Sequence, residues 1–133
     1  MIVADTTLIS YFTIEGEFTE DAVAVRREDP QWAAPLLWRA EFLNVLWTYV
    51  NQDVLELSLA LEHLDTAEDL IGKDSYDVSA PHVLRLAAES GCTAYDCHYV
   101  ALARMKSVPL VTHDTELQAA FPGRVVSPDA FLR

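Results

Sequence analysis

Ile2-Val3-Ala4-Asp5-Thr6-Thr7 joins a short apolar run to a helix-capping sequence. The apolar run predicts a buried strand, and the aspartate after it is a favoured first residue of a helix because its side chain accepts bonds from unpaired N–H groups. Val108-Pro109-Leu110-Val111-Thr112-His113-Asp114 likewise runs from an apolar strand into an aspartate. Two strand–aspartate–helix units in one short chain favour an α/β fold with a parallel sheet.

Strands and helices alternate between and around these two units. Further short strands are predicted at 32–35, 75–78 and 125–126. Helical spacing of apolar residues predicts helices from residue 8, within 15–29, and at 36–52, 55–71, 81–90, 93–106 and 116–121. No Gly/Ser-rich linker interrupts the chain. We therefore expect one domain over residues 1–133, a three-layer α/β/α sandwich with a short central parallel sheet.

Two long helices carry predicted apolar faces. The face of helix 36–52 consists of Trp38, Phe42, Val45, Leu46 and Tyr49. The face of helix 55–71 consists of Leu57, Leu61, Leu64 and Leu70. Larger aromatic residues are interpreted as core or dimer contacts rather than as platforms for base stacking: Trp32, Trp38, Trp47, Tyr49, Tyr95 and Tyr99.

Composition restricts the class of protein. Of 133 residues, 51% are hydrophobic, which is enough for a core and excludes disorder and collagen. The two cysteines, Cys92 and Cys97, provide neither a disulfide framework nor a zinc site, and we expect them to be reduced. The N-terminal residues lack the pattern of a signal peptide, and no apolar run is long enough for a membrane span. A cytoplasmic protein is expected.

The net charge of −12, from 9 Lys+Arg and 21 Asp+Glu, argues at first against a nucleic-acid partner. Eight of the acids lie between Asp53 and Asp77, beside the single Lys73. This stretch is interpreted as a solvated face, with docking of a basic protein segment as the alternative.

Three aspartates lie where strands end or helices start. Asp5 and Asp114 follow strands, and ligands of open α/β sheets bind at the carboxyl ends of strands. Asp96 lies in Thr93-Ala94-Tyr95-Asp96, which fits a capping box. A purely structural role as helix caps is the alternative for all three.

Glu41 differs because it lies inside a helix. Its neighbours include Trp38, Phe42 and Trp47, and an unpaired carboxylate is costly to bury among such side chains. Glu41 is therefore a candidate site residue; the alternative is a boundary residue paired with Arg39 or left in water.

Four carboxylates in one pocket require a cation, because like charges raise each other's pKa. Oxygen ligands without nearby thiolate or imidazole suit Mg²⁺ or Mn²⁺. Such a site suits phosphoryl chemistry, in which the ion polarises a phosphate and activates water. The spacing of the acids permits this pocket without proving it.

The chain resembles the PIN-domain ribonucleases, and among them the VapC-type toxins of prokaryotic toxin–antitoxin pairs. The resemblance extends from residue 1 to about 130. Its ordered motifs read Ile2-Val3-Ala4-Asp5-Thr6-Thr7-Leu8-Ile9, Ala40-Glu41-Phe42-Leu43-Asn44-Val45-Leu46, Thr93-Ala94-Tyr95-Asp96 followed by Tyr99-Val100-Ala101-Leu102-Ala103, and Leu110-Val111-Thr112-His113-Asp114-Thr115-Glu116-Leu117.

The resemblance implies catalytic and metal-binding roles for four acids, Asp5, Glu41, Asp96 and Asp114. The three aspartates would hold Mg²⁺ or Mn²⁺, and the glutamate would complete the shell or orient the attacking water. Thr6 and Thr112 match hydroxyl positions that orient carboxylates or bound water. Asn44 matches a polar position three residues after the glutamate, whereas His113 matches no fixed feature and is expected to face solvent.

The implied activity is endoribonuclease cleavage of RNA phosphodiesters, leaving 5′-phosphate and 3′-hydroxyl ends. The implied partners are RNA, a cognate antitoxin protein and a second copy in a homodimer, with no membrane. Two alternatives stay open: a catalytically silent interaction module, and another Mg²⁺-dependent phosphohydrolase. The acidity is then compatible with RNA, since bound cations would adapt the acidic pocket to phosphate.

Overall fold

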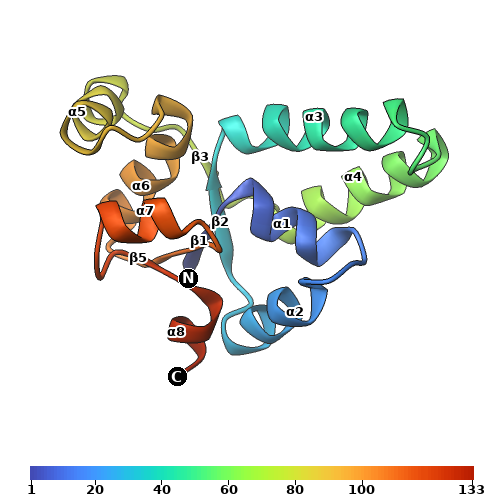
Figure 1. Ribbon diagram of the computed structural model, residues 1–133, viewed down its shortest axis with the longest axis horizontal. Helices are drawn as coiled ribbons and strands as arrows, with labels where there is room; N and C mark the ends of the chain where they lie inside the picture. The colour runs from blue at the N-terminus through green and yellow to red at the C-terminus, as the bar shows by residue number, and fades with distance from the viewer.

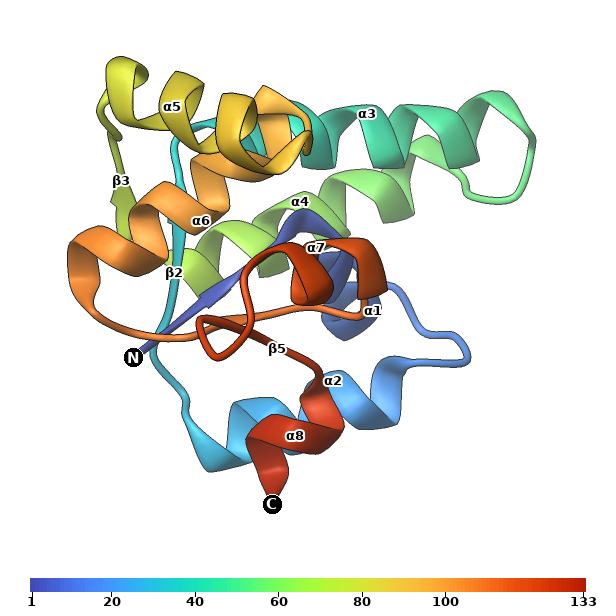
Figure 2. The same cartoon turned by 60° about the vertical axis from the view of Figure 1, so that its left-hand side comes forward.

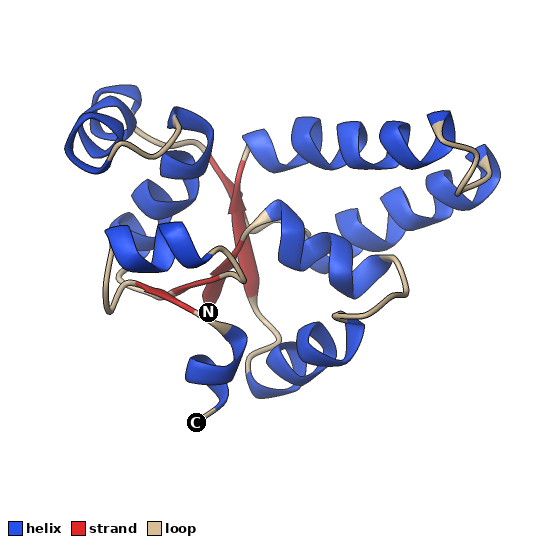
Figure 3. Ribbon diagram, viewed as in Figure 1, coloured by secondary structure: helices blue, strands red, loops and turns tan.

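The computed structural model describes residues 1–133, with a parallel sheet at its centre (Figure 3). The five strands follow the order β3-β2-β1-β4-β5 across the sheet. Their bounds are β1 Ile2–Ala4, β2 Trp32–Pro35, β3 Ser75–Tyr76, β4 Leu110–Val111 and β5 Val125–Val126. The predicted parallel sheet is confirmed.

The strand order changes direction beside β1. The chain moves outward from β1 to β2 and β3, then returns to place β4 on the other side of β1. Val3 lies opposite Ala33 of β2 and opposite Leu110 of β4. The crevice outside the carboxyl ends of β1 and β4 is therefore a switch point, the usual location of a ligand site in open α/β sheets.

Helices cover both faces of the sheet, which confirms the three-layer sandwich (Figure 1). One face is covered by α1 Thr6–Thr13, α2 Thr19–Glu28, α3 Leu37–Asn51 and α4 Leu57–Ile71. The other is covered by α5 Ala80–Ser90, α6 Ala94–Lys106 and α7 Thr115–Ala120. Figure 2 shows α5 stacked over α6. None of the helices combines the length and the apolar character that a membrane span needs.

Every predicted strand and helix is present, and one further helix was not predicted. This helix, α8 Pro128–Leu132, packs against α2. Ser127 caps it by accepting a bond from the N–H of Ala130, and Pro128 occupies its first turn. A Ser-Pro sequence is a recognisable helix start, so the signal was available.

The inward face predicted for α3 is largely correct. Trp38, Phe42 and Leu46 are buried at successive helical turns. Tyr49 of the predicted face is exposed instead, and Trp47, at 58% exposure, does not belong to the core either. The burial of the first three residues fixes how α3 is rotated about its axis, and therefore the direction in which the Glu41 side chain, next to Phe42, projects from the helix.

The face predicted for α4 is wrong in its first half. Leu57 and Leu61 are exposed, and Ala60, Ala67, Leu70 and Ile71 are buried instead. Small alanines let the helix approach its neighbours closely, and this packing outweighs the larger leucines. The exposed leucines instead line an apolar groove of about 260 Å³ between α3 and α4, with Leu43, Leu46, Trp47, Val50, Leu57, Ala60, Leu61 and Leu64 on its walls.

Candidate active site

Asp5 and Asp114 follow the neighbouring strands β1 and β4 at the switch point, and both cap a helix. Asp5 Oδ1 accepts from the N–H of Leu8, 2.8 Å away, and Asp114 Oδ1 accepts from the N–H of Leu117, 3.0 Å away. The capping interpretation is therefore correct for both. It does not exclude a site, because capping uses one oxygen of each carboxylate and holds the other in a fixed direction.

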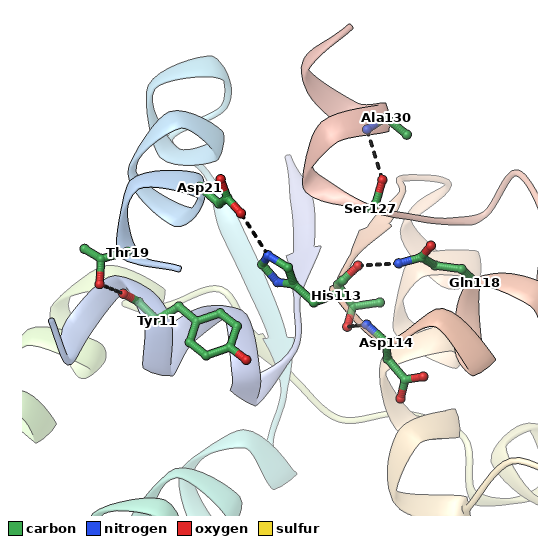
Figure 4. A network of polar contacts seen from close by, with 9 residues as sticks. Tyr11, Thr19, Asp21, His113, Asp114, Gln118, Ser127 and Ala130 are labelled. Carbon is green, nitrogen blue, oxygen red and sulfur yellow. Dashed lines mark hydrogen bonds and ion pairs between the residues drawn. The ribbon is translucent and has the colours of Figure 1, made fainter. Parts of the chain in front are cut away.

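Thr112 joins the two aspartates. Its hydroxyl donates to Asp5 Oδ2, 2.5 Å away, and accepts from the backbone N–H of Asp114, 3.1 Å away. The Thr112 side chain is fully buried. The end of β4 is held further by Gln118, whose side-chain amide donates to the Thr112 carbonyl at 2.8 Å (Figure 4).

Glu41 is held by two hydroxyl groups. Tyr99 Oη donates to Glu41 Oε1 at 2.6 Å, and Thr6 Oγ1 lies 3.1 Å from the same oxygen. Thr6 and Tyr99 are themselves in hydrogen-bond contact at 2.5 Å. Helices α1, α3 and α6 thus meet at one carboxylate. The alternative in which Glu41 pairs with Arg39 is wrong, because Arg39 forms an ion pair with Glu68 at 3.1 Å.

Asp96 lies in the first turn of α6, where its backbone N–H donates to the Thr93 hydroxyl at 3.1 Å. The predicted cap at Thr93 is therefore present. The Asp96 side chain is half-buried, and this bond uses only its backbone. Its carboxylate is left available on the side of the sheet where Asp114 lies.

Electrostatics show that the aspartates act on one another. Burial raises the pKa of Asp5 from 3.8 to about 6, and the charge of Asp96 adds to this shift, against the hydrogen bonds from Thr112 and Leu8. Burial also raises the pKa of Asp96, with the charge of Asp114 as the second cause. The carboxylates therefore repel one another, and a cation would relieve this repulsion.

Tyr99 also has a perturbed acidity. Burial raises the pKa of its phenol, and the neighbouring charge of Glu41 raises it further. The phenol therefore stays protonated at neutral pH and serves as a permanent donor to Glu41.

The donors of this site suit a hard divalent cation. Carboxylate and hydroxyl oxygens lie at the ends of β1 and β4 and on α3 and α6, and such oxygens are the ligands of Mg²⁺ and Mn²⁺. No three side chains stand ready to hold an ion as they are arranged. Binding one therefore requires side-chain rotation, which the unpaired carboxylate of Asp96 permits.

His113 does not face solvent as predicted. It is half-buried, its ring contacts Tyr11 and Phe18 with centroids 5.1 and 5.0 Å apart, and its Nε2 lies 3.2 Å from Asp21 Oδ2 (Figure 4). The prediction failed because the loop after β4 packs against α1 and α2, a tertiary contact that the local sequence does not contain.

Tyr99 is the functional candidate whose role the sequence interpretation missed. It belongs to the core as expected, at 2% exposure, but its hydroxyl reaches Glu41. One signal was available: Tyr99 follows Asp96 by three residues, which puts both on one side of α6.

Known proteins are similar to this chain in sequence. The profile of the PIN domain family matches residues 2–121. The chain is 29% identical to Ribonuclease VapC3 of Pyrobaculum aerophilum over 127 residues, 93% of this chain and 97% of that relative.

Two solved structures are similar in fold. A crystal structure of another Pyrobaculum aerophilum protein has a TM-score of 0.77 at 23% identity, covering 98% of this chain and 85% of that one. A toxin–antitoxin complex from Klebsiella pneumoniae has a TM-score of 0.68 at 21% identity, covering 96% and 98%.

Proposed function

The chain belongs to the PIN domain family, and we propose that it is a divalent-metal-dependent endoribonuclease, the toxin of a VapC-type toxin–antitoxin pair. The observation that carries the proposal is the placement of Asp5, Asp96 and Asp114 around the switch point, where the charge of Asp96 helps to raise the pKa of Asp5 and the charge of Asp114 helps to raise the pKa of Asp96. The similarity to a relative named a ribonuclease supports the same activity.

In this proposal the three aspartates hold Mg²⁺ or Mn²⁺. The ion, when bound, supplies Lewis-acid chemistry: it polarises the phosphate and lowers the pKa of the attacking water. Thr112 keeps Asp5 turned toward the site and fixes the start of α7, so that Asp114 is presented from a rigid helix cap.

Glu41 is proposed to orient the attacking water. Tyr99 and Thr6 both contact Oε1, which leaves Oε2 to accept a hydrogen bond from the water. The water oxygen attacks phosphorus in line as the bond to the 3′ oxygen breaks; the water loses a proton to solvent, and the departing 3′ oxygen takes one up from solvent. The products carry a 5′-phosphate and a 3′-hydroxyl.

Cleavage of a circular single-stranded RNA tests this function, because only an endonuclease can open a circle. We expect cleavage with Mg²⁺ or Mn²⁺, no cleavage in chelator, and a loss of about a hundredfold in Asp96→Asn. The matched control is Asp65→Asn, which removes an exposed carboxylate from α4. Equal cleavage with chelator, or by Asp96→Asn, contradicts the proposal and favours a silent interaction module.

Removing the Tyr99 hydroxyl tests the role of Glu41. Tyr99→Phe is expected to lower kcat by roughly tenfold to a hundredfold with little change in KM, because orientation of the water affects the chemical step. Tyr76→Phe is the matched control, since it removes a tyrosine hydroxyl bonded to a carboxylate, Asp74, at 2.8 Å in β3. A rise in KM alone, or equal losses in both variants, would contradict the assignment.

A protein antitoxin and a second copy of the chain are the proposed partners. The apolar groove between α3 and α4 supports protein contacts, because exposed leucines and a tryptophan gather there without cover. The toxin–antitoxin complex with the same fold supports the antitoxin. Light scattering of the purified chain tests the dimer, which a monomer mass over the micromolar range would contradict.

A further inference from the structure

A second groove adjoins the acids on the side of Glu41. It has a volume of about 540 Å³, within the roughly 300–1,000 Å³ typical of small-ligand sites. Its walls come from the start of α1, the first half of α3 and the first turn of α6, with Thr6, Thr7, Leu37, Ala40, Glu41, Asn44, Val45 and Tyr95 as lining residues. Because Glu41 belongs to both, the groove and the acid site are continuous.

Tyr95 forms one wall of this groove with an exposed aromatic ring. The side chain is 64% exposed, so it is not a core residue; of the interpretation as a core or dimer contact, only the dimer contact stays open for it. It lies directly before Asp96, in the first turn of α6. An exposed aromatic ring one residue from a carboxylate that is proposed to hold the metal ion is positioned to stack against a flat ligand, and a nucleobase is such a ligand.

Asn44 supplies the polar contact that a base edge needs. It is exposed and takes part in a hydrogen bond only through its backbone carbonyl, which accepts from the Thr48 hydroxyl; its side-chain amide has no partner within the chain and is free for a ligand. An amide both donates and accepts hydrogen bonds, which matches the edges of bases. Leu37, Ala40 and Val45 complete an apolar floor.

The charge of the groove favours a base over a phosphate. No lysine or arginine lines it, and Glu41 is its single charged residue. Arg39, the nearest basic residue along α3, is held by Glu68 on another side of the helix. A phosphate would be repelled here, whereas an uncharged base would not.

We propose that this groove binds one unpaired nucleobase next to the scissile phosphate, with the base stacked on Tyr95 and its edge read by Asn44. The inference rests on the proposed function for the identity of the substrate as RNA. It assigns base preference to Asn44.

The test measures binding separately from cleavage. Fluorescence anisotropy follows labelled six-nucleotide RNAs of each single base, with Mg²⁺, in an Asp114→Asn background that is expected not to cut. Tyr95→Ala is expected to raise the Kd about tenfold, and Tyr95→Phe to restore binding, since a phenyl ring also stacks. Asn44→Leu is expected to reduce the differences in Kd among the four RNAs.

The matched control is Trp47→Ala, which removes an exposed aromatic from the α3–α4 groove. Equal binding by Tyr95→Ala and Trp47→Ala overturns the inference, as does an absence of RNA binding in the parent. Failure of the proposed function has a different signature. The Asp114→Asn protein then cleaves RNA, or the unsubstituted chain does not, and neither result depends on the substitution at Tyr95. A groove used by a protein instead would leave RNA binding unchanged in Tyr95→Ala.

Discussion

Asp5→Asn is expected to reduce RNA cleavage by about a thousandfold and, in chelator at pH 8, to unfold at a higher temperature than the parent chain. The loss of activity follows from removing a charged ligand, since metal catalysis contributes several kcal/mol and each 1.36 kcal/mol is about tenfold in rate. The gain in stability follows from the cost of keeping an ionised carboxylate in the fold.

The sign of the pH dependence follows from the raised pKa. Asp5 has a pKa of about 6 in the fold against an ordinary 3.8, so the folded state binds its proton more tightly. The associated stability is present below pH 3.8 and is lost as the pH rises through 6. The full shift corresponds to roughly 3 kcal/mol, and losing the Thr112 bond offsets about 1 kcal/mol of the gain.

Thermal unfolding across pH measures the second half of this prediction. The Tm difference between Asp5→Asn and the parent should be roughly 5 °C at pH 8 and should vanish near pH 4. Adding Mg²⁺ should raise the Tm of the parent more than that of the variant, because only the parent keeps the Asp5 carboxylate as a ligand of the ion. A variant that is less stable than the parent at pH 8 would contradict the account; Asp65→Asn should change neither property.

Phe42→Ala is expected to destabilise the chain by about 3–5 kcal/mol, which lowers Tm by roughly 10–15 °C. Phe42 is fully buried and packs beside Trp38 with ring centroids 6.1 Å apart. Truncation leaves a cavity under the turn of α3 that carries Glu41. Activity should therefore fall at temperatures well below the new Tm, because the carboxylate loses its support.

Leu43→Ala is the matched control, since the next residue on the same helix is 45% exposed. Its expected cost is within about 1 kcal/mol. Chemical denaturation of both variants measures the difference. If both variants lost a similar free energy of unfolding, Phe42 and Leu43 would be equally buried. Helix α3 would then be rotated about its axis, and Glu41 would not face Tyr99 and Thr6.

The sequence predicted the sheet and the location of the aspartates because both depend on local patterns. An apolar run followed by Asp5 or Asp114 specifies a strand end and a helix cap together, and parallel pairing of β1 with β4 then brings the two caps into one crevice. Glu41 could be singled out because its neighbours are apolar. These features need no knowledge of distant contacts.

The remaining features depend on such contacts. The close approach of Ala60 and Ala67 to the neighbouring elements decides which face of α4 is buried, and the spacing of the leucines alone cannot reveal this. His113 is enclosed by rings from α1 and α2, about a hundred residues away along the chain. The reach of Tyr99 to Glu41 depends on how α6 and α3 face each other, which no periodicity encodes.

The Thr112 hydroxyl connects residues at opposite ends of the chain, since its partner Asp5 is 107 positions earlier. During synthesis, Asp5 emerges from the ribosome early and remains without its neighbour until β4 has been made. Contacts of such long sequence separation also carry a loop-closure cost in entropy, which slows folding. A chain made only as far as α6 lacks Thr112 and Asp114, and the acidic site cannot form until β4 and the cap of α7 have been synthesised.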